Sequence, residues 1–212
     1  MNIIDRIKEY DIECLSDSLN CIGLNNSISK FKYTVSDKMT VGYAYPISFE
    51  LCDDKEKCIA ADYIDDVEEQ SIIVIDNNNI DYCTVWGNIL TEVSIIKKIN
   101  GTIINGAARD ITRIKELEYP LYCKHIHCKT GKGIVRLKTI CEPVTIDNTT
   151  IKKNDIVVAY NSLVLIIPNE KIEEVLEIAD KLSKAEDNII NAIKNGYKLK
   201  DARSMYKYND FK

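Results

Sequence analysis

Long hydrophobic segments are absent from this 212-residue sequence. The longest apolar runs, at residues 72–75 and 163–167, are far shorter than the roughly 20 residues that a membrane-spanning helix needs. Residues 1–11 alternate apolar and charged side chains and contain no apolar segment of the kind that marks a secretory signal peptide. We therefore expect a soluble, cytoplasmic protein without a membrane partner.

Positive charge is also scarce. The chain has 28 Lys and Arg residues against 33 Asp and Glu residues, which gives a formal net charge of -5. A broad nucleic-acid-binding face needs a surplus of Lys and Arg, so we expect no nucleic-acid partner. The charge balance still allows a small basic pocket for an acidic ligand, and the turn Lys129-Thr-Gly-Lys-Gly133 can contribute to one.

The sequence has only two histidines, both within Cys123-Lys-His-Ile-His-Cys128. On a strand, Cys123, His125 and His127 would share one face, and thiolate with imidazole is a ligand set that suits Zn²⁺. No second ligand pair follows at metal-binding spacing, so we favour a half-buried strand with two polar positions. No Ser/His/Asp arrangement can be inferred, and no GxGxxG-type loop follows a strand, which argues against a methyltransferase.

The eight cysteines are irregularly spaced, and none forms a CxxC motif. In a reducing compartment such residues mostly behave as small buried hydrophobic side chains, so we do not expect disulfides. The chain also has no Pro- or Ser-rich linker and no internal repeat. A single domain over residues 1–212 is therefore expected, with an N-terminal helical segment at 1–30 and a C-terminal helix at about 169–195, followed by a tail.

Hydrophobic spacing predicts an α/β protein. The predicted helices are at residues 2–20 (one helix or two short ones), 89–99, 111–117 and 169–195, and the predicted strands are at 40–50, 71–76, 102–105, 119–128, 134–138, 143–151 and 155–167. In the second helix Ile89, Leu90, Val93 and Ile96 are expected to face the core. Residues 53–69 form an acidic stretch with apolar residues at helical spacing. Strand and helix alternate in the first half and strands dominate the second, which indicates layered sheets flanked by helices.

Two segments, Trp86-Gly-Asn-Ile-Leu90 and Gly101-Thr-Ile-Ile-Asn-Gly-Ala-Ala-Arg-Asp110, resemble the core of the RraA-like family. This family contains regulators of RNase E activity and 4-hydroxy-4-methyl-2-oxoglutarate (class II pyruvate) aldolases, and its members are often labelled demethylmenaquinone methyltransferases. Its pattern is a usually acidic loop residue followed by Arg-Asp, here Asn88 and Arg109-Asp110. Further segments match in the expected order: residues 15–19, 72–76, 119–122, 154–159 and 164–168.

The resemblance implies a layered β/β/α sandwich of the swivelling-domain type over nearly the whole chain. It also implies a homotrimer or a hexamer with active sites at subunit interfaces. The activity implied is that of a divalent-metal-dependent lyase acting on small anionic 2-oxo acids, by retro-aldol cleavage or by oxaloacetate decarboxylation. Mg²⁺ or Mn²⁺ would act as a Lewis acid that holds the pyruvate enolate.

By the same resemblance, Asp110 would be the metal ligand, because Mg²⁺ needs only one or two carboxylates besides water. Arg109 would stabilise the developing oxyanion and the substrate carboxylate. Gly87 would precede a helix start whose N–H groups, at Asn88, Ile89 and Leu90, would bind the pyruvate carboxylate. A structural interpretation stands beside this one: Asp110 can be the N-cap of the helix that follows it, and Arg109 can pair with a surface carboxylate.

Three positions depart from the pattern of the aldolases. Asn88 stands where they have an acid, and an amide cannot accept a proton at neutral pH. Asn105 stands where many members have Asp, and Tyr160-Asn-Ser-Leu163 replaces an acidic turn. These departures favour the alternative to the lyase, a non-catalytic protein of the ribonuclease-regulator type that binds a protein partner or a small acidic ligand.

Overall fold

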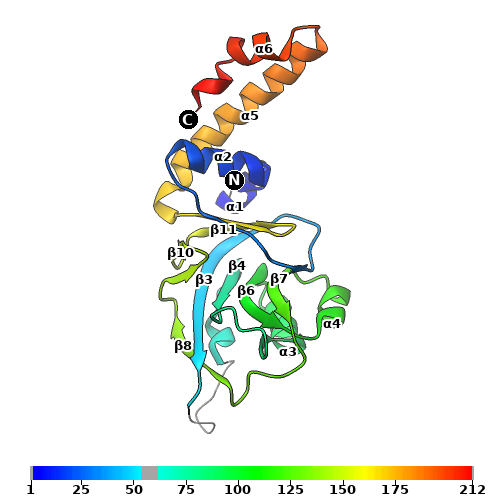
Figure 1. Ribbon diagram of the computed structural model, residues 1–212, viewed down its shortest axis with the longest axis vertical. Helices are drawn as coiled ribbons and strands as arrows, with labels where there is room; N and C mark the ends of the chain where they lie inside the picture. The colour runs from blue at the N-terminus through cyan, green and yellow to red at the C-terminus, as the bar shows by residue number, and fades with distance from the viewer. Residues whose placement is uncertain (1, 54–61, 212) are drawn as a thin grey trace. The chain divides into compact units, whose positions relative to one another are not determined.

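The protein is described by a computed structural model that covers residues 2–53 and 62–211 (Figure 1). The chain forms two compact units: Met1–Asn26 with Asn169–Lys212, and Ser27–Pro168. The single domain over residues 1–212 stays a prediction. No helix in the described part of the chain is long and apolar enough to cross a membrane.

The first unit is helical. Its elements are α1 (Ile3–Ile7), α2 (Ile12–Cys21), η3 (Asn169–Lys171), α5 (Ile172–Lys194), α6 (Leu199–Met205) and η4 (Tyr208–Asp210). Helix α5, predicted at about 169–195, buries an apolar stripe that includes Ile172, Val175, Leu176, Ala179 and Leu182. Polar contacts join α1 and the turn after it to α5: Arg6 of α1 pairs with Asp180 at 3.3 Å, and the hydroxyl of Tyr10, which follows α1, donates to Asp180 Oδ1 at 2.6 Å. Helix α6 was not predicted.

The second unit is built around one large sheet. Its strands are β1 (Ser27–Ile28), β2 (Tyr33–Thr34), β3 (Thr40–Leu51), β4 (Ser71–Asp76), β5 (Thr84–Trp86), β6 (Gly101–Ala108), β7 (Leu121–Ile126), β8 (Val135–Ile140), β11 (Ile156–Tyr160) and β12 (Leu163–Ile167), and its helices are η2 (Asp62–Asp66), α3 (Asn88–Ile96) and α4 (Ile111–Glu116). A separate hairpin contains β9 (Val144–Ile146) and β10 (Thr149–Ile151). The predicted α/β fold is confirmed.

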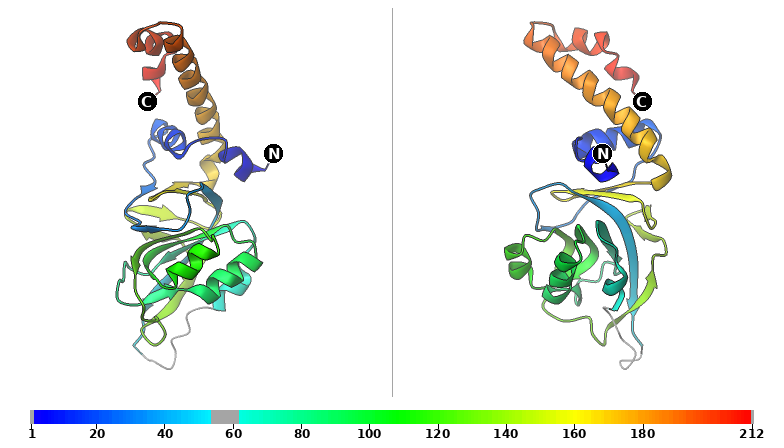
Figure 2. Two further views of the ribbon diagram at one scale, coloured as in Figure 1. Left: turned by 90° about the vertical axis from the view of Figure 1, so that its right-hand side faces the viewer. Right: turned by 180° about the vertical axis from the view of Figure 1, so that it is seen from behind.

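Parallel strands form the centre of the sheet, in the order β3-β4-β6-β7, and β5 adds to β6 in the same direction. The long β3 also pairs antiparallel with β11 near its start and with β8 near its end. Helix α3 leads from β5 to β6, and α4 leads from β6 to β7. The two helices lie side by side (Figure 2), joined by an ion pair between Arg113 and Glu92 at 3.2 Å.

The central strands are buried on both faces, which explains why their sequences are continuous apolar runs. In β4, Ile73 and Ile75 pack into one hydrophobic cluster, while Ile72 and Val74 pack into the other. Alternate side chains of a strand point to opposite faces, so each residue of the run contributes to one of two cores. The strand at 71–76 is therefore predicted correctly, and β6 extends three residues beyond its predicted end at 105.

The expected inward face of α3 is wrong for two residues. Ile89 and Ile96 are 76% and 79% exposed, while Thr91 and Ser94 are fully buried. The large indole of Trp86 fills the space under the helix and donates from Nε1 to Thr91 Oγ1 at 2.9 Å, so small polar side chains face inward. Leu90 and Val93 pack partly against the core, as predicted.

Two other expectations change in part. Asp62–Asp66 is a 3-10 helix that buries Tyr63 and Ile64, and the preceding residues 54–61 of the acidic stretch lie outside the described part. Cys52 is disulfide-bonded, contrary to the expectation of reduced thiols, whereas Cys14, Cys21, Cys83, Cys123, Cys128 and Cys141 are free. Cys58 lies outside the described residues.

We expect Ile73→Ala to destabilise the sheet unit by about 2–5 kcal/mol, because Ile73 is fully buried in a central strand and truncation leaves a cavity. Ile96→Ala is the matched control, since Ile96 is 79% exposed, and should change the free energy of unfolding by less than about 0.5 kcal/mol. Urea denaturation followed by circular dichroism measures both. Equal effects of the two substitutions would contradict the assigned burial.

Candidate active site

The ends of two neighbouring parallel strands create the site. Trp86, the last residue of β5, pairs with Ala108 at the end of β6, and the Arg109 N–H donates to the Trp86 carbonyl at 3.0 Å. Because β5 and β6 run in the same direction, their carboxyl ends lie at the same end of the sheet. Gly87-Asn88 and Arg109-Asp110, which follow these strands, therefore lie close together. Ligands of open parallel sheets commonly bind at such carboxyl ends of strands.

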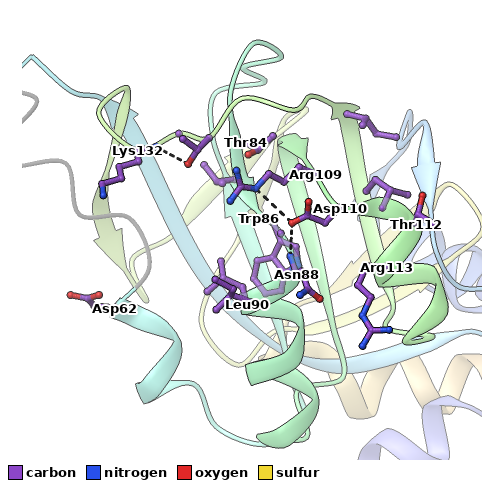
Figure 3. Close-up of a pocket in the computed structure, with 17 residues that line it drawn as sticks. Asp62, Thr84, Trp86, Asn88, Leu90, Arg109, Asp110, Thr112, Arg113 and Lys132 are labelled. Atoms are coloured by element: carbon purple, nitrogen blue, oxygen red, sulfur yellow. Dashed lines mark hydrogen bonds and ion pairs between the residues drawn. The ribbon is translucent and has the colours of Figure 1, made fainter.

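Asp110 connects the two strand ends. Its backbone is left-handed, with φ 60° and ψ 27°, and its side chain makes no capping hydrogen bond to α4, the helix that it precedes. Its Oδ2 instead accepts from the Asn88 N–H at 2.9 Å and lies 3.7 Å from Arg109 Nε (Figure 3). Asp110 therefore occupies the N-cap position of α4, as the structural interpretation expected, but its carboxylate caps the start of α3 instead.

Gly87 provides the space for this contact. A Cβ atom at position 87 would lie 2.7 Å from Asp110 Oδ2 and 3.1 Å from Arg109 Nε. Gly87 is also the N-cap residue of α3 and has no side chain to cap the helix itself. The Asp110 carboxylate takes over that role, and its negative charge stabilises the positive end of the helix.

The Asp110 carboxylate keeps one oxygen atom for a ligand at this point. Asn88 Oδ1 is buried without a hydrogen-bond partner in the described structure, and both contacts of the Asp110 carboxylate are made by Oδ2. A carboxylate oxygen completed by water or substrate oxygens is a donor set that fits Mg²⁺ or Mn²⁺. Among the described residues no group of three His, Cys, Asp or Glu residues could hold a metal, so a metal here would depend on Asp110 alone for a charged ligand.

A pocket of about 1230 Å³ opens over this constellation. All six residues that the sequence singled out line it: Gly87, Asn88, Ile89, Leu90, Arg109 and Asp110. The N–H groups of Ile89 and Leu90 belong to the first turn of α3 and have no intrahelical acceptor, whereas the N–H of Asn88 already donates to Asp110. The structure thus brings the predicted residues together around one cavity.

Sequence reasoning missed other residues of the wall, among them Asp62, Thr84 and Arg113. Arg113 lies one turn along α4 from Asp110, a spacing that could have revealed it. Its hydrogen bonds to Glu116 and Glu92 raise the pKa of its guanidinium, which forms an ion pair with each of these carboxylates. Arg109, by contrast, pairs only with Asp110 among the described side chains.

Lys132 reaches the pocket from the turn at residues 129–133. The Gly131 N–H donates to the Thr84 carbonyl at 2.8 Å, and a Cβ atom at position 131 would lie 2.7 Å from that oxygen. Only glycine therefore allows the turn to approach β5 so closely. The turn is thereby held in the wall of the pocket, and its contribution to an anion site stays a prediction.

The Cys/His segment does not form a metal site in the described structure. Cys123 is fully buried, and burial raises the pKa of its thiol to about 12, which keeps it protonated. His125 Nε2 contacts Asn79 Oδ1 at 2.9 Å, and His127, beyond the end of β7, accepts the Lys129 N–H at Nδ1. The favoured interpretation, a partly buried strand with two polar positions, agrees with these contacts.

We expect Gly87→Ala to destabilise the protein by about 1–3 kcal/mol, because its Cβ overlaps the Asp110 carboxylate. In an Asp110→Ala background the same substitution should cost less than half as much, since the overlapping oxygen is gone. A double-mutant cycle from chemical denaturation gives the coupling energy. Additive effects of the two substitutions would contradict the described contact.

Comparison with known proteins supports these observations. The RraA-like family model, described as Aldolase/RraA, matches residues 12–166. Protein DlpA of Legionella pneumophila is 34% identical over 209 residues, which are 98% of this chain and 34% of DlpA, so the chain spans about a third of that relative. A "Putative 4-hydroxy-4-methyl-2-oxoglutarate aldolase" of Halalkalibacterium halodurans is 26% identical, over 85% of this chain and 83% of that protein.

A solved structure agrees with this assignment. An uncharacterized protein from Pseudomonas syringae pv. tomato superposes with a TM-score of 0.81 at 30% identity, covering 95% of this chain and 96% of that one. The match of the family model includes both strand ends and every predicted site residue. This chain therefore belongs to the RraA-like family.

Proposed function

We propose that the protein is a divalent-metal-dependent lyase that releases pyruvate from small anionic 2-oxo acids. The observation that carries the proposal is the Asn88–Arg109–Asp110 constellation, in which the Asp110 carboxylate lies beside the Arg109 guanidinium and accepts the backbone N–H of Asn88 in the wall of a large pocket. A substrate of this class has two anionic or polar oxygens on adjacent carbons. These oxygens can accept hydrogen bonds from the Arg109 guanidinium and from the N–H groups at the start of α3.

Each residue has a distinct role in the proposed reaction. Breaking a C–C bond next to a 2-oxo group leaves a negative charge on the keto oxygen, which Arg109 can stabilise with its planar fork of N–H donors. The N–H groups of Ile89 and Leu90 bind the substrate carboxylate. Asp110 would hold Mg²⁺ or Mn²⁺, and the metal would supply Lewis-acid stabilisation of the enolate.

The alternative is a binding protein of the regulator type on the same scaffold. The observation that favours it is the exposed apolar side of α3, where Ile89, Ile95 and Ile96 are 76%, 40% and 79% exposed. Exposed isoleucines on one helix suit a protein contact, either with a partner or with another copy of this chain. The homotrimer or hexamer expected from the resemblance stays a prediction.

Asp110→Ala should abolish metal-dependent pyruvate release from oxaloacetate and from 4-hydroxy-4-methyl-2-oxoglutarate, by about 100-fold or more in kcat/KM. It should also weaken Mn²⁺ binding in a titration without substrate. The matched control is Asp62→Ala, because Asp62 lies across the pocket from Asp110 (Figure 3), and we expect it to stay within threefold of wild type in both measurements. No wild-type turnover above the free-metal background would reject the lyase and support the binding protein.

Arg109→Ala should lower kcat/KM by roughly 100-fold, because the guanidinium is the cation nearest to Asp110. Arg109→Lys should recover only part of the activity, since an ammonium cannot contact two oxygens in parallel. Arg113→Ala is the control, because Arg113 lines the same pocket but is held by Glu92 and Glu116. A larger loss in the Arg113 variant than in the Arg109 variant would contradict the assigned roles.

A further inference from the structure

A second cavity, of about 400 Å³, lies in the helical unit and shares no residue with the candidate active site. Its volume is in the range of small-ligand pockets. Helix α2, helix α5 and the C-terminal segment around η4 form its wall, with Asp17, Asn20, Cys21, Leu182, Tyr208 and Phe211. We call it the helical cavity.

The periodicity of α2 places three of these residues together. Asp17, Asn20 and Cys21 are separated by steps of three and one, so their side chains lie on one face of the helix. Helix α2 contacts α5 through Cys14, whose thiol donates to the Ala179 carbonyl at 3.8 Å. The polar side of the cavity is therefore built on a helix that is packed against its neighbour.

The C-terminal segment contributes the apolar side. The Tyr208 hydroxyl donates to Glu186 Oε1 of α5 at 2.7 Å, and the Phe211 ring meets the Tyr208 ring edge to face, with 6.3 Å between centroids. The Arg203 guanidinium lies 5.2 Å from the centroid of the Tyr208 ring. Together with the buried Leu182, the two rings give the cavity an apolar surface that can hold the body of a ligand.

The charge of the wall is negative. Of the described residues in this wall only Asp17 is ionised at neutral pH, and it has no hydrogen bond or ion pair within the described part of the chain. The hydrogen bond to Glu186, burial and the charges of Glu186 and Asp17 raise the pKa of Tyr208 to about 12. Burial and the charge of Asp17 also raise the pKa of the Cys21 thiol, so this thiol stays protonated.

A ligand of this cavity has to complement one carboxylate and an apolar surface. An anion would be repelled by Asp17, and a hydrated metal ion would leave the aromatic and aliphatic surface without a partner. A primary ammonium ion on a carbon chain satisfies both, because its three N–H groups donate to oxygen atoms while the chain packs against Leu182 and Phe211. Aromatic rings also attract cations, as the contact between Arg203 and Tyr208 illustrates.

We propose that the helical cavity is a binding site for a small organic amine, a primary ammonium ion on a short apolar chain. Asp17 is its counter-ion, and the amide oxygen of Asn20 accepts a second hydrogen bond. Leu182 and Phe211 contact the carbon chain. This binding function is independent of the proposed lyase reaction, because the two cavities have no residue in common.

Calorimetric titration of the full chain with phenethylamine and with 2-phenylethanol, its neutral analogue, tests the proposal. The amine should bind about fivefold or more tightly than the alcohol, since a hydrogen bond to a charged group is stronger than one between neutral groups. Asp17→Asn has nearly the same shape and should remove this preference. Phe211→Ala should weaken the binding of both compounds, because both use the apolar surface.

Asp201→Asn is the matched control, since Asp201 is exposed on α6 and does not line the cavity. It should leave the affinity for phenethylamine within about twofold of wild type, as expected for a screened surface charge. Circular dichroism verifies that each variant keeps its helices. Equal affinities of the wild type for the amine and the alcohol would overturn the inference, as would equal losses of amine affinity in the Asp17 and Asp201 variants.

Discussion

The parallel pairing of β5 with β6 is the constraint on which the site depends. It places Gly87-Asn88 and Arg109-Asp110 at one edge of the sheet, although these pairs are separated by a helix and a full strand. The Asp110 carboxylate can then reach the start of α3 because Gly87 leaves the space empty. One contact thus caps a helix, orients a carboxylate and positions the guanidinium beside it.

That contact gives Asp110 a structural and a chemical role together. Its Oδ2 stabilises the N-terminus of α3 and the charge of Arg109, and the carboxylate at the same time faces a large pocket. The two roles reinforce each other, since a side chain held by two partners loses little further freedom when it binds a ligand. Substitution of Asp110 accordingly affects the helix start as well as any chemistry.

Asn88 contributes to the site through its backbone. Its N–H donates to Asp110 Oδ2, while its side-chain oxygen is buried without a partner in the described structure. The charges at this part of the pocket wall are therefore those of Asp110 and Arg109, which lie 3.7 Å apart.

The sequence alone determined the central strands and the long C-terminal helix, because apolar runs and helical spacing are local properties. Its resemblance to the family implied that Asn88, Arg109 and Asp110 belong to one site. It could not determine the partner of Asp110, the exposed side of α3, or the disulfide state of Cys52. Those depend on contacts between residues that are far apart in the chain. The Trp86 indole packs under α3 and leaves Ile89 and Ile96 exposed, and the absence of a side chain at Gly87 allows the Asp110 carboxylate to contact α3. Steric exclusion and hydrogen-bond pairing across strand ends exist only in the folded chain, so only the tertiary structure decided them.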